Sequence, residues 1–472
     1  MKSKILLALG ILSSSALTSA CSSPANCPTC GTTQNGTVTV IATMEVPQSS
    51  PFGKPFTVWD LVSHDPVNRR LYVTDRSHAA IAVFDTTNDM TIGQVKNGFV
   101  GSVCCEPDRI SNFNEVSGPN GAIVTPPTVA GGKLGNLWVS DGDSTVKVFN
   151  LDTDTLPVAH NDGTASQTFG TARTGISFTN IDTCSRSGLT DVTCGDLRAD
   201  EPSFDPEHNR LIVTNGDTPG PGGPIVTLID TTNPTCAGNS CVLAQFFFDG
   251  GGDTATTGCP GPAVSGVAPV NGGAIRCRHV GSGFSPYATN GLGGSIYNPG
   301  THKFLQAVPQ VGPNPADGEV TEIDPVAFQV TNHFALKGLG CQAASLAIGP
   351  NNNVLVGCAN REGEAFPPST FIMDGTTGKI INSIFQVGRV DQVWYNPGDK
   401  RFYLAARDME QGSFLGIIDA TNNMWLYNAP TGGNAHGVAA DPVNNHIYVP
   451  IGVNARCGKF SAEGCITVYA AP

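Results

Sequence analysis

Four side chains that could bind a metal ion stand at one fixed distance from a recurring turn. Asp60, Asp200, Asp391 and His436 each lie five residues before an Asp-Pro or Asn-Pro dipeptide. Carboxylates suit Ca²⁺ or Mg²⁺, and carboxylates combined with an imidazole suit Mn²⁺ or Zn²⁺. The sequence therefore predicts a site for one divalent cation, provided that the fold brings these positions together.

Further polar residues are expected beside these positions. Glu201 and Gln392 each follow one of the aspartates in sequence, although alternation along a strand would aim them elsewhere. Arg76 and Arg407 lie eleven residues beyond two of the dipeptide turns, and His78 is close to Arg76. Guanidinium groups bind carboxylates, which predicts a small acidic ligand. The alternative is that the arginines are solvated turn residues and the aspartates cap backbone N–H groups.

The elements that must position these residues come from an internal repeat. Each copy has an alternating strand, a turn with Asp, Asn, Pro or Gly, and a strand rich in β-branched and aromatic residues. Six copies carry the turn, and a seventh, at 135–150, keeps only the strands. The six copies are DPVNRRLYVTD from Asp65, FDPEHNRLIVTNGD from Phe204, YNPGTHKFLQA from Tyr297, IGPNNNVLVGCAN from Ile348, YNPGDKRFYLAARD from Tyr395 and DPVNNHIYVP from Asp441.

The first copy extends to four strands, at 58–64, 70–75, 81–85 and 91–95. Seven units of four antiparallel strands predict an all-β fold, a seven-bladed β-propeller over residues 37–472. The last unit offers only three strands, so the spare strand at 37–46 is expected to complete it and close the ring. First strands line the channel of a propeller, so Asp60, Asp391 and His436, from blades one, six and seven, should meet at its mouth.

The strands LYVTD and LIVTN resemble the YVTN-type β-propeller repeats of exported bacterial proteins and of relatives of 6-phosphogluconolactonase. The resemblance covers roughly residues 37–472 and implies the same seven-bladed fold. Propellers of this kind include lactonases, lyases and binding modules, so the resemblance does not choose among these functions.

The N-terminus has the features of an export signal. Residues 1–20 combine Lys2 and Lys4 with the short apolar run ILLALGIL and small residues, as in a signal peptide. LTSAC, ending at Cys21, resembles a bacterial lipoprotein signal, while ordinary cleavage after Ala20 remains the alternative. We expect a lipid anchor on Cys21, a flexible tether at 21–36, and a place in the cell envelope, either at the outer membrane or in the periplasm, with exposure at the cell surface as a further alternative.

The cysteine count agrees with an oxidising compartment. Of the 15 cysteines, lipidation of Cys21 leaves 14, enough for seven disulfides. Cys27 and Cys30 have the spacing of a redox or metal motif, but pairing with Cys104 and Cys105 is the preferred interpretation. Local pairs are expected for the others: Cys184 with Cys194, Cys236 with Cys241, Cys259 with Cys277, Cys341 with Cys358, and Cys457 with Cys465.

Charge and missing motifs restrict the function. A net charge of −13 without a basic run argues against nucleic-acid binding. No complete catalytic motif stands in the sequence, so we expect a monomeric module that binds a small acidic ligand or an envelope protein. One alternative is a metal-assisted lactonase or lyase in which Asp391 and His436 are catalytic; another is a structural surface protein.

Three long insertions rich in Gly, Thr, Ser and Pro interrupt the repeats, at 104–133, 157–198 and 248–291. Long loops on a propeller often form lids or recognition surfaces. Four residues of the third insertion are expected near the fourth blade's end of the channel: Arg276, Arg278, His279 and Tyr287.

Overall fold

The structure is a computed structural model, and it describes residues 37–47, 55–96, 98–102, 117–128, 130–152, 170–173, 198–216, 224–236, 241–254, 276–285, 287–360 and 366–471. The predicted signal peptide, the tether and Cys21 lie outside these ranges. The compact unit begins at Thr37. In the described ranges helix is confined to 3₁₀ segments at Pro350–Asn352 and Ala455–Phe460. No helix there is long and apolar enough to cross a membrane.

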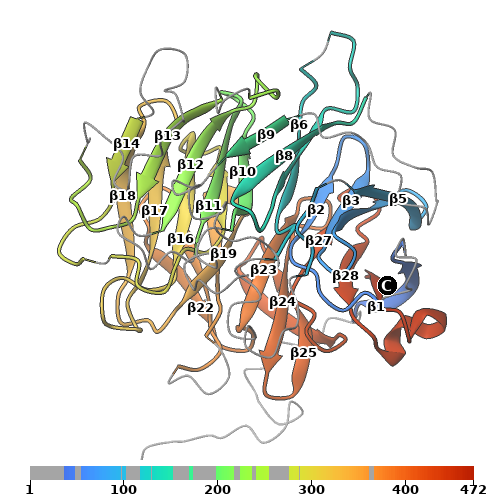
Figure 1. Cartoon of the computed structure of the whole chain (residues 1–472). Helices are drawn as coiled ribbons and strands as arrows, with labels where there is room; N and C mark the ends of the chain where they lie inside the picture. Colours follow the sequence, from blue (N-terminus) through green and yellow to red (C-terminus); the bar gives the residue numbers. More distant parts are fainter. Residues whose placement is uncertain are drawn as a thin grey trace, which may run out of the picture. The chain divides into compact units, whose positions relative to one another are not determined.

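Seven sheets follow one another in a ring, as the repeats predicted (Figure 1). Each sheet consists of consecutive strands, except that the last blade also takes the first strand of the chain, and the strands pair antiparallel except for β13 with β14 in blade three. The blades are β2 (Val62–Asp65), β3 (Arg70–Asp75), β4 (Ala80–Asp85) and β5 (Met90–Lys96); β6 (Ala122–Thr125), β7 (Asn136–Ser140), β8 (Thr145–Asn150) and β9 (Gly170–Arg173); β10 (Asp200–Asp205), β11 (Arg210–Asn215), β12 (Ile225–Asp230), β13 (Val242–Phe247) and β14 (Arg276–His279); β15 (Ser295–Asn298), β16 (Lys303–Val308), β17 (Gly318–Asp324) and β18 (Gln329–Leu336); β19 (Ala343–Ile348), β20 (Asn353–Cys358), β21 (Thr370–Asp374) and β22 (Ile380–Ile384); β23 (Val390–Asn396), β24 (Arg401–Met409), β25 (Gly412–Asp419) and β26 (Met424–Pro430); and β27 (Ala439–Ala440), β28 (Ile447–Ile451), β29 (Cys465–Ala470) and β1 (Thr39–Glu45).

The recurring dipeptide builds the turn between the first two strands of a blade. Asp65 Oδ1 accepts the backbone N–H of Val67 at 2.9 Å, and Asp441 Oδ1 accepts that of Val443 at 2.8 Å. Arg69, four residues after Asp65, has a φ of 50°, which is left-handed. Such side-chain to backbone bonds hold an Asx turn, so the repeated Asp or Asn is a turn residue.

The ring closes as predicted, because β1 pairs with β29 in the last blade (Figure 1). Asp441, in the turn of that blade, also accepts two hydrogen bonds from the guanidinium of Arg69 in blade one, at 2.9 and 2.7 Å. The side chain of Asp441 is fully buried, and Thr86 of blade one donates to the same oxygen at 2.6 Å. The N-terminal strand thus completes the last blade by backbone pairing, and a partly buried ion pair links that blade to blade one.

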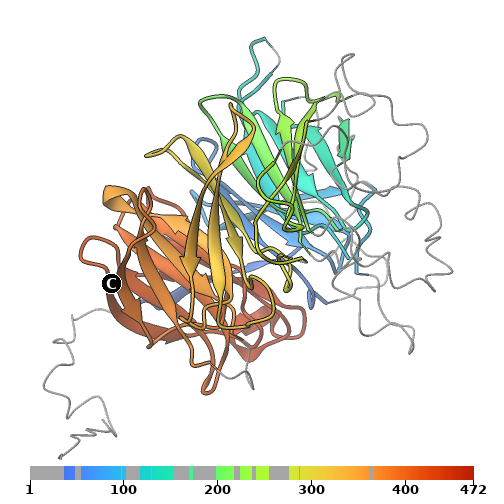
Figure 2. The ribbon, with the colours of Figure 1, turned by 90° about the vertical axis from the view of Figure 1, so that its left-hand side faces the viewer.

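The hydrophobic core lies between neighbouring sheets, which stand face to face (Figure 2). Strand β28 shows how the sequence does this. Ile447 and Val449 pack toward blade six, whereas Tyr448 between them packs with Leu71 and Phe84 of blade one. Because side chains alternate along a strand, a strand that is apolar on both faces buries both of them.

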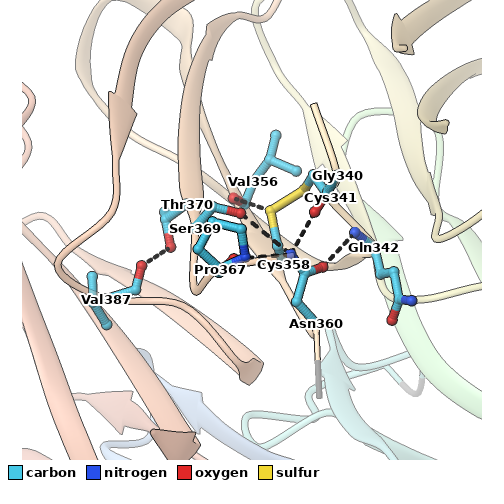
Figure 3. The surroundings of a disulfide bond; sticks show 10 residues. All are labelled: Gly340, Cys341, Gln342, Val356, Cys358, Asn360, Pro367, Ser369, Thr370 and Val387. Carbon is cyan, nitrogen blue, oxygen red and sulfur yellow. Dashed lines mark hydrogen bonds between the residues drawn. A yellow bond between two sulfur atoms is a disulfide. The ribbon is translucent and has the colours of Figure 1, made fainter. Parts of the chain in front are cut away.

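Three of the predicted disulfides are confirmed: Cys236–Cys241, Cys341–Cys358 and Cys457–Cys465. The second spans the start of blade five, with a Cα–Cα distance of 5.0 Å. Beside it, Asn360 accepts the backbone N–H of Gln342 at 2.8 Å and donates to the carbonyl groups of Gly340 and Pro367 (Figure 3). Cys277 is disulfide-bonded too. The other predicted partners lie outside the described residues: Cys184, Cys194 and Cys259, as well as Cys27, Cys30, Cys104 and Cys105.

The expectation for the third insertion was wrong. Its residues Arg276–His279 form β14, a fifth strand that pairs parallel to β13 at the outer edge of blade three. Arg276 stacks over the ring of Phe328 at 4.2 Å, on the outer hairpin of blade four. The insertion therefore bridges the outer parts of two blades, because an open sheet edge offered it backbone partners that the channel does not.

Candidate functional site

The innermost strands surround a cavity of about 430 Å³. Apolar residues and serines line most of it, including Ser63, Ser203 and Ser345 from three different blades. Glu201 and Gln392 line it as well. The cavity is the central channel that the propeller fold predicts, and charged residues gather beside it.

The predicted ring aspartates and rim arginines are partners of one another. Arg407 Nη1 lies 2.8 Å from Asp391 Oδ2. Arg76 makes the corresponding ion pair with Asp60, and only 4% of the Arg76 side chain is exposed. In blades one and six, the offset that predicted a metal ligand and the offset that predicted an anion site therefore give the two partners of one ion pair.

Two residues of this cluster were missed by sequence reasoning. Arg198 binds Asp200 at 2.8 Å and lies 3.8 Å from Asp60, so it links blade three to blade one. Asn120 accepts two hydrogen bonds from Arg76, at 3.0 and 2.7 Å. Asn120 could have been found, because it lies five residues before Thr125-Pro126, the dipeptide that opens the turn of blade two.

The cation site predicted from spacing is compact. One ligand atom from each of Asp60, Asp391 and His436 lies within 4.8 Å of the others. His436 stacks on Trp59 at 4.9 Å, and its two ring nitrogens lie 2.7 Å from the carbonyl oxygen of Asn434 and 3.2 Å from that of Trp59. Burial lowers the pKa of His436, which favours the neutral imidazole.

Carboxylates at the mouth raise one another's pKa. Burial raises the pKa of Asp60 to about 7; Arg76 opposes the rise, and Asp200 and Asp391 add to it. Burial also raises the pKa of Glu201 well above its usual range, with further contributions from Asp200, Asp391 and Asp60. Such mutual shifts mean that negative charge is crowded here and that a cation would relieve it.

Glu201 reaches the channel although strand alternation predicts otherwise. The ladder between β10 and β11 shifts register between Asp200 and Ser203, which interrupts the alternation. The carboxylate extends toward blade four, where a Cβ at Gly294 would lie only 1.8 Å from Glu201 Oε2. The glycine therefore leaves the space that the Glu201 carboxylate occupies.

The two remaining predicted ligand residues have partners inside the fold. The side-chain oxygen of Gln392 accepts the backbone N–H groups of Val62 and Val438, at 3.1 and 3.0 Å, and its nitrogen donates to the carbonyl of Val62 at 2.6 Å. Gln392 thus ties blade six to blades one and seven. His78 is buried, with Nδ1 2.5 Å from Asp75 Oδ2.

No protein-family model matches this chain, and no curated protein matches it. Among solved structures, it is similar to a chain in the crystal structure of a mitotic checkpoint complex, with a TM-score of 0.52 and 9% sequence identity. The match covers 99% of this chain and 98% of that one. At this identity the likeness shows the fold alone. The chain is a seven-bladed β-propeller, and its resemblance to YVTN-type repeats stays a prediction.

Proposed function

We propose that this propeller is a ligand-binding module whose ligand at the channel mouth is a cation, with a divalent metal ion as the leading candidate. The supporting observation is the triad Asp60, Asp391 and His436, whose ligand atoms lie within 4.8 Å of one another. Two carboxylates and a neutral imidazole suit Zn²⁺ or Mn²⁺ better than Ca²⁺.

The balance of charge favours a cation over the acidic ligand expected from the arginines. The guanidinium groups of Arg76, Arg198 and Arg407 each contact an aspartate of the cluster. Glu201 adds a fourth carboxylate to these three pairs, and burial, followed by the charges of Asp200, Asp391 and Asp60, raises its pKa. A bound cation would relieve the repulsion among these carboxylates and would lower the pKa of Glu201.

The test is the metal content and metal affinity of the purified full chain. Titration calorimetry with Mn²⁺ should show a site that is lost in Asp391→Asn and in His436→Ala, and titration with Zn²⁺ should lose one bound ion in each of these variants. Asp374→Asn is the control, because Asp374 forms an ordinary turn in blade five with Thr376 and Thr377. If Asp391→Asn and His436→Ala bind the metal ions as tightly as the unchanged protein and the Asp374→Asn control, the proposal is overturned.

A metal-assisted enzyme, either a lactonase-type hydrolase or a lyase, is the second candidate. It is favoured by the cavity of about 430 Å³, which is lined in part by Glu201 and Gln392 and could hold a substrate against the ion. An ion there would polarise a carbonyl, and Asp391 or His436 would accept a proton. Hydrolysis of simple lactones in the presence of Mn²⁺ or Zn²⁺ would support this function if the activity is lost in Asp391→Asn. Metal binding without any turnover would support the ligand-binding module instead.

The envelope location, the lipid anchor and the monomeric state are part of the proposal. They are supported by the signal-like residues 1–20, by Cys21 and by three disulfides, which form in oxidising compartments. Labelled palmitate should be incorporated by the full chain and not by Cys21→Ala when both are expressed in a bacterium. If the protein binds no metal and an envelope protein co-purifies with it, that envelope protein would be its partner. If it binds no metal and nothing co-purifies with it, a purely structural role would be indicated.

A further inference from the structure

A second group of metal-ligating side chains lies at the other end of the inner strands. One potential ligand atom from each of Asp205, Glu207 and His208 lies within 4.8 Å of the others. These residues form the turn between β10 and β11. Because Asp200 begins β10 and Asp205 ends it, this turn is separated from the channel mouth by the length of the strand.

A buried carboxylate orients the imidazole of His208. Asp205 is fully buried, and its Oδ2 lies 2.7 Å from His208 Nδ1. In blade one the same position is Asn68, whose side-chain nitrogen donates to Asp65 at 2.5 Å. The turn therefore uses only Nδ1 of the histidine, and Nε2 is the nitrogen that can bind a metal. A carboxylate that fixes one imidazole nitrogen while the other binds the ion is usual around metals.

A second imidazole comes from the neighbouring blade. His302, in the turn between β15 and β16, has its Nδ1 2.6 Å from Glu207 Oε2. The Tyr297 hydroxyl donates to the same oxygen at 3.0 Å. The two hydrogen bonds to this oxygen hold the Glu207 carboxylate beside the turn of blade four.

We propose that Glu207, His208 and His302 form a surface site for a divalent transition-metal ion of the Zn²⁺ type, with Asp205 holding His208 in orientation. Two imidazoles and one carboxylate are a common ligand set for Zn²⁺ and leave a fourth position for water. The ion would link the turns of blades three and four. The site is independent of the channel mouth and does not depend on the function proposed for it.

The test compares Zn²⁺ binding by the purified full chain and by a double variant, His208→Asn with His302→Asn. Both substitutions suit the turns: Asn68 already fills the first position in blade one, and His302 has a φ of 57°, which asparagine tolerates well. The double variant should bind Zn²⁺ at this site about 100-fold more weakly or not at all. Binding should also weaken at about pH 5.5, where protons compete for the imidazoles.

Two controls separate this site from others. His446→Asn changes a histidine in the corresponding turn of blade seven and should leave Zn²⁺ affinity unchanged. Asp391→Asn removes only the channel-mouth site, so one Zn²⁺ should remain bound to that variant. Unchanged affinity and stoichiometry in the double variant would overturn the proposal, and so would loss of all Zn²⁺ binding in Asp391→Asn.

Discussion

Arg407 donates a hydrogen bond of 2.8 Å to Asp391, which precedes it by 16 residues, and Arg76 contacts Asp60 across the same separation. The repeat therefore places an aspartate near the start of the first strand and an arginine near the end of the second, where antiparallel pairing brings them together. The cluster at the channel mouth is built from such pairs, with Glu201 as the additional acid.

The two pairs should differ in what their loss costs. Arg76→Met leaves Asp60 in a buried place without its nearest cation, so the free energy of unfolding should fall by about 3–5 kcal/mol. The Arg407–Asp391 pair is more exposed, at 23% and 24%, and Arg407→Met should cost about 1 kcal/mol. Urea unfolding measures both, and equal losses would contradict the assignment of the buried pair.

His333 should make stability depend on pH. Burial alone would lower its pKa, but hydrogen bonds and charge attraction from Glu319 and Asp253 outweigh burial and raise the pKa to about 9. Because the folded pKa is above the usual value of 6.5, the stabilisation is complete below about pH 6.5 and is lost as the pH rises through about 9.

His333→Gln tests that dependence. At a side chain that is 27% exposed, the variant should lose about 1–2 kcal/mol of unfolding free energy at about pH 6, and almost none at about pH 10. Denaturant unfolding of both proteins across this range gives the difference. A difference that stays constant with pH would show that His333 contributes only by packing.

The disulfides should contribute according to the length of chain that they close. The Cys341–Cys358 bond spans 17 residues, and replacing both cysteines by alanine should cost about 3 kcal/mol. The Cys236–Cys241 bond spans only 5, and its double replacement should cost about 2 kcal/mol. Thermal and urea unfolding under oxidising conditions measure both values, and a larger loss for the shorter loop would contradict this order.

The strand that closes the ring offers a matched pair of substitutions. Met44 on β1 is 2% exposed and packs between blades seven and one, whereas Ile41 on the same strand is 50% exposed. Met44→Ala should lower the unfolding free energy by about 2–4 kcal/mol, and Ile41→Ala by less than about 1 kcal/mol. Similar effects of the two would mean that β1 is not packed as part of the last blade.

The repeat allowed the blades to be predicted because its turn depends on local chemistry. Strand β3 (Arg70–Asp75) has the predicted bounds, since Asp65 and Arg69 specify the turn before it. Strand β2 begins at Val62 rather than at residue 58, because the first strands of these blades lose regular pairing near the channel mouth. That irregularity depends on contacts between blades, which no single repeat encodes.

The candidate site was predicted only in part for the same reason. Asp60, Asp391 and His436 come together because each has the same place in its blade, and a fixed offset from the turn can find them. Arg198 belongs to an insertion without a repeat, so no offset points to it. The ion pair between Arg76 and Asp60 could be recognised only from interatomic distances in the structure, because sequence spacing alone does not determine which side chains of a hairpin are in contact.

Pairing between β1 and β29 also governs when this protein can fold. A chain still emerging from the ribosome contains β1 long before its partner, because β29 (Cys465–Ala470) is synthesised more than 400 residues after β1. The earlier blades can form locally, but the ring must wait for a contact between residues more than 400 positions apart. Such a contact of very high sequence separation is slow to form, so closure is expected to limit the rate of folding.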